Sequence, residues 1–120
     1  MAGRRTRAGA APILVAASSY VLNCALGTAV ATRVIDTRRF RWVHHVLYVC
    51  TCASTAAAVV LAVSRGHDRR PALALAPAAV PLAVIPYAGT RGRRHPLVAL
   101  AAAPFYIAAV VCALRPRDRK

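Results

Sequence analysis

The chain has almost no acidic residues. Its 120 residues include no glutamate and three aspartates, Asp36, Asp68 and Asp118, none of which lies in a long apolar stretch. Proton-coupled pumps and cation transporters commonly use an Asp or Glu inside the membrane to bind the proton or the ion. The chain therefore lacks the central residue of those mechanisms.

The residue patterns of an enzyme are also missing. A serine nucleophile requires a histidine base that a carboxylate orients. The apolar stretches contain no carboxylate that could do this for any of the four serines. Cys50 and Cys52 are separated by one residue, which is not the C-x-x-C redox spacing. The segment 89–92 reads as a tight turn and not as a phosphate-binding loop. We therefore predict neither an enzymatic activity nor a bound cofactor.

Basic residues, in contrast, are abundant and confined to short clusters. The chain holds 17 Lys and Arg residues, its net charge is +14, and 58% of its residues are hydrophobic, with a mean hydropathy of +0.49. The stretches 8–32, 42–64, 71–90 and 95–114 contain no charged residue. About 20 apolar residues cross a hydrocarbon core roughly 30 Å thick. The sequence thus predicts a single membrane domain over residues 1–120, with spans at approximately 11–32, 42–64, 71–89 and 96–114.

The predicted fold class is all-α. A bilayer core offers no water to backbone groups, so a span is a helix or a barrel strand, and these stretches lack the period-2 alternation of barrel strands. Pro77, Pro81 and Pro86 interrupt the third stretch, and each removes a backbone hydrogen bond. We expect an integral membrane four-helix bundle with short basic loops and a Pro-kinked third helix. A re-entrant third segment is the alternative, and Pro104 predicts a milder kink in the fourth helix.

The placement of basic residues predicts the orientation. The two tails and the second loop hold ten Lys and Arg residues, whereas the first and third loops hold seven. Cytoplasmic loops are enriched in Lys and Arg, so the N- and C-termini are both expected in the cytoplasm. The margin is narrow, and insertion in both orientations, which would permit an antiparallel homodimer, is the alternative. Arginine outnumbers lysine sixteen to one, which is typical of a GC-rich genome, and we place the chain in a bacterial inner membrane.

The same clusters indicate the partners of the chain. Each Arg or Lys near the bilayer surface attracts anionic lipid headgroups by on the order of 1 kcal/mol. The basic residues alternate with apolar runs and do not form one helical face or one tail, so a nucleic-acid partner is not expected. Anionic lipids, a homo-oligomer or a larger membrane complex are the expected partners.

The N-terminus leaves one alternative open. A basic start, an apolar stretch and Ala29-Val30-Ala31 fit the cleavage pattern of a signal peptide. The apolar stretch is long for such a peptide, and Tyr20 and Asn23 interrupt it. We therefore favour a first span that is not cleaved.

Polar residues within the first two spans recur at helical spacing. Such side chains normally face the interior of a helix bundle, because hydrocarbon solvates them poorly. The second-span stripe consists of His44, Tyr48, Thr51, Cys52 and Thr55, and the first-span ridge of Ser19, Asn23, Gly27 and Ala31. We predict that the stripe and the ridge pack together, because consecutive elements usually lie side by side. Asn23, near the middle of its span, needs a hydrogen-bond partner.

A second interpretation of these residues is a polar path for a solute. Ser19, Asn23, Tyr48, Thr51, Cys52 and Thr55 would then line a small transporter or channel. Small and weakly polar residues are, however, the ordinary contacts of transmembrane bundles. Packing is therefore the favoured interpretation of the two stripes.

Histidines and cysteines supply the remaining candidates. His44, His45 and His95 begin the second and fourth spans, so they share one membrane face, and His67 lies on the other. Imidazole binds transition metals and haem, which makes a haem- or metal-binding redox module a further alternative. Interfacial histidines more often lie at the level of the lipid headgroups as amphipathic residues. We interpret Cys24 as a buried free thiol and not as a disulfide-bonded cysteine. Our main hypothesis is a structural or accessory subunit of a membrane complex.

Overall fold

The computed structural model describes residues 2–36, 38, 41–66, 68–89 and 93–115, and each regular element in these ranges is helical. In chain order the α-helices and 3₁₀-helices (η) are α1 (Ala2–Ala31), α2 (Arg41–Ser64), α3 (Arg70–Leu75), η1 (Ala76–Ala78), α4 (Ala79–Val84), η2 (Ile85–Tyr87), α5 (Arg94–Ala101) and α6 (Ala103–Leu114). The all-α prediction is confirmed for this part of the chain.

Four helical segments of the described chain have the length and hydropathy of membrane spans. They run over Arg7–Ala31, Arg41–Ser64, Arg70–Tyr87 and Arg94–Leu114. Their ends lie within four residues of the spans expected from the charge-free stretches. By length and composition the chain is therefore a multi-pass membrane protein.

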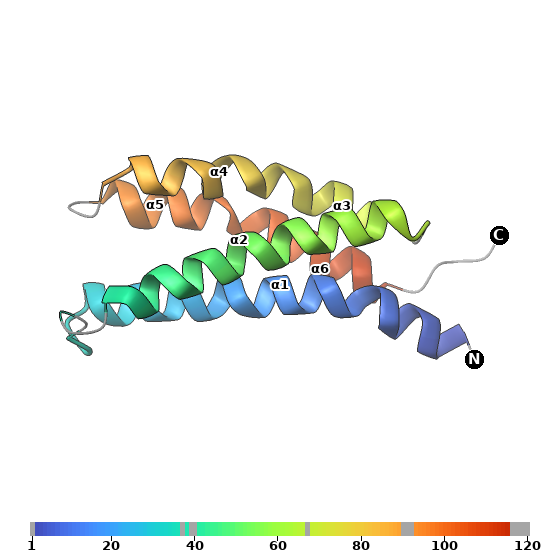
Figure 1. Ribbon diagram of the computed structural model, residues 1–120, viewed down its shortest axis with the longest axis horizontal. Coiled ribbons are helices and arrows are strands. Elements are labelled where there is room, and N and C mark those ends of the chain that lie inside the picture. The colour runs from blue at the N-terminus through green and yellow to red at the C-terminus, as the bar shows by residue number, and fades with distance from the viewer. Residues whose placement is uncertain (1, 37, 39–40, 67, 90–92, 116–120) are drawn as a thin grey trace.

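The segments are arranged as two antiparallel pairs (Figure 1). Helix α1 packs most widely against α2, while α6 packs against both α3 and α1 and so joins the pairs. The start of α1, the α2–α3 connection and the end of α6 lie at one end of the molecule (Figure 1). The α1–α2 turn and the start of α5 lie at the other. This arrangement puts the end of α1 and the starts of α2 and α5 on one side, as four consecutive spans require.

Prolines divide the third segment into short pieces. Pro71 lies in the first turn of α3, where a missing N–H costs nothing, whereas Pro77 and Pro86 lie in η1 and η2, and Pro81 lies within α4. A proline inside an α-helix removes the hydrogen bond to the carbonyl four residues earlier. The segment alternates between α and 3₁₀ geometry where these bonds are lost.

The fourth segment is interrupted at Ala102. Helix α5 ends at Ala101 and α6 begins at Ala103, and the N–H of Ala102 donates to the carbonyl of Ala99 at 3.3 Å. Pro104, two residues later, lacks the N–H that would continue the α-helical pattern to Leu100. The structure therefore shows two helices where the sequence led us to expect a kink in one.

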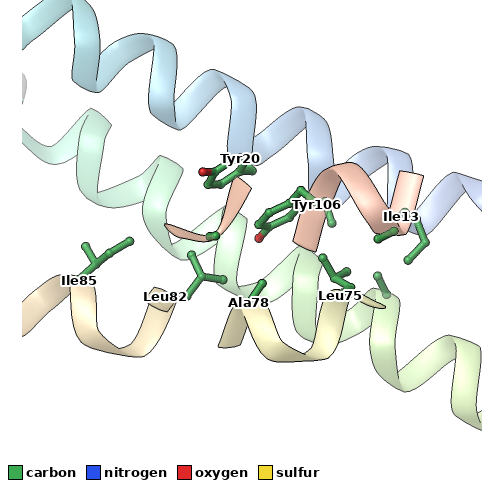
Figure 2. Close-up of a cluster of buried hydrophobic side chains, with 11 residues drawn as sticks. Ile13, Tyr20, Leu75, Ala78, Leu82, Ile85 and Tyr106 are labelled. Carbon is green, nitrogen blue, oxygen red and sulfur yellow. The ribbon is translucent and has the colours of Figure 1, made fainter. Parts of the chain in front are cut away.

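The core combines alanines, leucines and isoleucines with two tyrosines (Figure 2). Residues that face it recur every three or four positions, as one face of a helix does. They are Ile13, Ala16 and Tyr20 of α1, Ala58 of α2, Leu75, Ala78, Leu82 and Ile85 of the third segment, and Ala102, Tyr106 and Ala109 of the fourth. Alanine lets helix backbones approach closely, which compensates for the weak hydrophobic drive between helices in lipid.

Large apolar side chains cover the outside of all four segments. Val21, Val60, Val80 and Ile107 are each between 62% and 68% exposed, and Leu73 is 70% exposed. Monomeric water-soluble proteins rarely expose large apolar patches. By composition, this exposed surface suits lipid hydrocarbon better than water.

Candidate functional site

The second-span stripe faces the interior of the bundle. Thr51 is fully buried and Thr55 is 5% exposed, while Tyr48 and Cys52 are half-buried. The hydroxyl of Thr51 donates to the carbonyl of Leu47, one turn earlier, at 2.8 Å. Because this bond lies within α2, the Thr51 hydroxyl is satisfied without a hydrogen-bond partner on another helix.

Tyr48 links α2 to the proline-rich third segment. Its hydroxyl donates to the carbonyl of Leu82 at 2.8 Å. In an uninterrupted α-helix that carbonyl would accept the N–H of residue 86, but residue 86 is a proline and has none. Tyr48 therefore satisfies the carbonyl that Pro86 leaves free. Membrane helices tolerate proline where a neighbouring side chain supplies such a bond.

Thr55 belongs to a buried group with two tyrosines. The hydroxyls of Thr55 and Tyr106 lie 2.6 Å apart and share a hydrogen bond between α2 and α6. The Tyr106 ring stacks on the Tyr20 ring of α1, with centroids 4.2 Å apart and planes 7° from parallel. The two rings lie side by side between the helices in Figure 2. We call Tyr20, Thr55 and Tyr106 the tyrosine cluster.

The Tyr20 hydroxyl extends the tyrosine cluster to α5. It donates to the carbonyl of Ala99 at 2.6 Å. The carbonyl of Ala99 also accepts the N–H of Ala102 at 3.3 Å. Tyr20 therefore adds a second bond at the break in the fourth segment, whereas Tyr48 supplies a bond that Pro86 removes.

Tyr20 and Tyr106 were not among our predicted site residues. In the sequence, Tyr20 is an interruption of an apolar stretch and Tyr106 is one aromatic residue among many apolar ones. A buried tyrosine hydroxyl usually finds a hydrogen-bond partner, and both tyrosines lie in spans. This rule could have predicted a hydrogen bond between helices at both tyrosines.

The first-span ridge is less well satisfied than the second-span stripe. Ser19 and Asn23 are half-buried, and the side-chain oxygen of Asn23 is buried without a hydrogen-bond partner. A Cβ atom built on Gly27 would meet no atom within 4 Å, so no helix of the described chain approaches closely there. Helices α1 and α2 pack together, but Tyr48 and Thr55 bond to α4 and α6 and not to the ridge.

Two of the predicted histidines approach each other. The rings of His44 and His95 lie 6.0 Å apart at 50°, and the Nδ1 atom of His95 is buried without a partner. His45 is exposed, and His67 lies outside the described residues. Within the described ranges, no three histidine, cysteine or acidic side chains gather as metal ligands would. The pair alone has too few ligands for the usual four-coordinate zinc site.

The four cysteines are free thiols. Cys24, Cys52 and Cys112 are half-buried and Cys50 is exposed. None of the four cysteines therefore forms a disulfide. The contacts that join the helices are hydrogen bonds of hydroxyl groups and the stacking of aromatic rings.

No family model, no curated protein and no solved structure matches this chain.

Proposed function

We propose that the chain is a structural or accessory subunit of a membrane complex in a bacterial inner membrane. The observation that carries this proposal is the use of its intramembrane hydroxyls. Tyr20, Tyr48, Thr55 and Tyr106 all form hydrogen bonds between helices. Side chains engaged in this way stabilise the packing of a bundle and are not free to solvate a moving solute.

The proposal includes an orientation and a bent third helix. The ten basic residues in the tails and second loop favour a cytoplasmic location for both termini over the opposite arrangement. Breaks in the α-helical pattern at Pro77 and Pro86 support a bend in the third segment. The proposal assigns no catalytic reaction to the chain, because its spans contain no carboxylate to orient a base.

Copurification from native membranes tests the proposal. The full chain carries a small affinity tag, is expressed near its native level and is extracted in a mild detergent. A subunit should recover a partner protein in a fixed stoichiometric ratio, and the ratio should persist through size-exclusion chromatography. A monodisperse chain that emerges alone, with its helical content intact, contradicts the proposal.

Two variants separate assembly from nonspecific adhesion. Thr55→Val combined with Tyr106→Phe weakens the tyrosine cluster, whereas Tyr87→Phe alters a side chain that is 88% exposed. A specific partner should dissociate more readily from the first variant and remain with the second. If both variants recover the same proteins, and the ratio of those proteins to the chain varies between preparations, the chain adheres to proteins nonspecifically through its exposed apolar surface. Solute flux through liposomes containing the pure chain would instead support the transporter alternative.

A further inference from the structure

A basic, open cavity lies at the turn between α1 and α2. That turn is at the end of the molecule opposite the start of α1 and the end of α6 (Figure 1). Its volume is about 650 Å³, within the roughly 300–1,000 Å³ of small-molecule sites. The described residues that line it are Val30, Arg33, Ile35, Asp36, Arg38 and Arg41. Three arginines and one aspartate therefore line a single space.

One carboxylate is set against three positively charged arginines. Asp36 accepts the backbone N–H of Arg38 at 3.0 Å, and among the described lining residues no ion pair joins it to a guanidinium group. The first turn of α2, which begins at Arg41, contains no acidic residue. The partial positive charge of that helix N-terminus adds to the charge of the three arginines. The cavity, called here the arginine cavity, thus selects an anion.

Arg33 occupies a position where glycine is usual. The N–H groups of Val34 and Arg33 donate to the carbonyls of Ala29 and Val30 at 3.0 and 3.1 Å, the two bonds of a Schellman cap at the end of α1. The residue at this position adopts a left-handed backbone, and Arg33 has a φ of 58°. A glycine would adopt this left-handed conformation without steric strain, but the chain has an arginine here, beside the cavity.

The surroundings of the arginine cavity point to an amphiphile. It lies where the first candidate span ends at Ala31 and the second begins at Arg41, which is the depth of lipid headgroups. Val30 and Ile35 line it, and the neighbouring Val34 is 77% exposed. Free phosphate would need only the polar half of this lining. A phospholipid would use both halves, the arginines for its phosphate and the aliphatic side chains for the start of its acyl chains.

We propose that the arginine cavity binds the phosphate group of one anionic phospholipid in the leaflet on the side of the first and third loops. Arginine forms bidentate hydrogen bonds with phosphate oxygens, so three guanidinium groups hold one phosphate in a defined place. This inference goes beyond the proposed function, because it holds whether or not the chain has a protein partner.

Native mass spectrometry of the full chain in detergent tests the inference, with phosphatidylglycerol, phosphatidylcholine and inorganic phosphate as probes. We expect one phosphatidylglycerol per chain, bound more tightly than phosphatidylcholine and retained in excess inorganic phosphate. Each arginine contributes about fivefold, the equivalent of roughly 1 kcal/mol. The triple substitution Arg33→Gln, Arg38→Gln and Arg41→Gln should therefore weaken phosphatidylglycerol binding by on the order of a hundredfold.

A matched triple substitution controls for overall charge. Arg4→Gln, Arg7→Gln and Arg115→Gln remove the same number of charges at the opposite end and should leave the tightly bound lipid in place. Equal loss of lipid from both triple variants would overturn the inference, because it indicates diffuse attraction. Equal affinity for phosphatidylcholine, or displacement of the lipid by inorganic phosphate alone, would also overturn it.

Arg33→Gly distinguishes loss of the site from loss of folding. Glycine adopts a φ of 58° without steric cost, so this variant should be at least as stable to thermal unfolding as the unmodified chain. Its affinity for phosphatidylglycerol should nevertheless fall by about fivefold. An unchanged affinity in this folded variant means that Arg33 does not contact the lipid.

Discussion

The hydrogen bond between Thr55 and Tyr106 offers a quantitative test of the packing interpretation. Tyr106→Phe removes the hydroxyl but keeps the ring, so the stack on Tyr20 at 4.2 Å is retained. Hydrogen bonds between membrane helices contribute about 0.6 kcal/mol on average and about 1.7 kcal/mol at most. This bond is short, at 2.6 Å, and its residues are 5% and 3% exposed. We therefore expect Tyr106→Phe to lower the free energy of unfolding by about 1–1.5 kcal/mol.

A double-mutant cycle isolates this bond from other effects of the substitutions. Thr55→Val removes the partner hydroxyl while nearly preserving the shape of the side chain. The free energy of unfolding is measured for both single variants and the double variant, with circular dichroism as sodium dodecyl sulfate is titrated into mixed micelles. Because the two hydroxyls bond to each other, the double variant should lose about 1 kcal/mol less than the sum of the single losses.

The control and the refuting result follow from the same assay. Tyr87→Phe removes a hydroxyl from a residue that is 88% exposed and should leave the free energy of unfolding unchanged within about 0.5 kcal/mol. If the losses at Thr55 and Tyr106 add within about 0.3 kcal/mol, the hydroxyls are not coupled. The Thr55–Tyr106 bond would then not stabilise the bundle, and the packing interpretation would lose its main support.

Further substitutions test the proline compensation, the unpartnered amide and the thiols. Tyr48→Phe should lower the free energy of unfolding by about 0.6–1.7 kcal/mol in the same titration, and by clearly less in a Pro86→Ala background, where residue 86 regains an N–H for the Leu82 carbonyl. Asn23→Leu should leave the free energy of unfolding unchanged or raise it, because the buried Asn23 oxygen has no partner to lose; a loss above about 1 kcal/mol would reveal a bond to this amide. Alkylation of the denatured chain without reductant should add four labels by mass spectrometry, since all four cysteines are free, and two fewer labels would indicate a disulfide.

The positions of the spans could be predicted because charge is confined to the loops. A charged side chain in hydrocarbon is so costly that long charge-free stretches nearly define the helices, and the four segments end within four residues of the expected positions. The inward face of α2 could also be inferred, because Thr51 and Thr55 stand out against apolar neighbours. Both inferences depend on contrast between polar and apolar residues along one helix.

The contacts between the helices could not be predicted in the same way. Lipid and protein interior are both apolar, so the sequence does not distinguish a core alanine such as Ala102 from the exposed Ala101 beside it. Tyr20 and Tyr106 are separated by most of the chain, and their stacking depends on the rotation and the vertical offset of two helices. Neither quantity is encoded in the spacing of residues within a single span.

The hydroxyl bonds also bear on the transporter alternative. A hydrated path along α2 would require its helix to turn Tyr48 and Thr55 away from their present partners. That movement would break the bond to the Leu82 carbonyl, which Pro86 cannot replace, so water in the path would have to supply the donor in place of Tyr48. Among the described side chains, the buried polar atoms that lack partners are Asn23 Oδ1 and His95 Nδ1. Water or a solute inside this bundle would therefore be stabilised beside Asn23 or His95, and not beside Tyr48, Thr51 or Thr55.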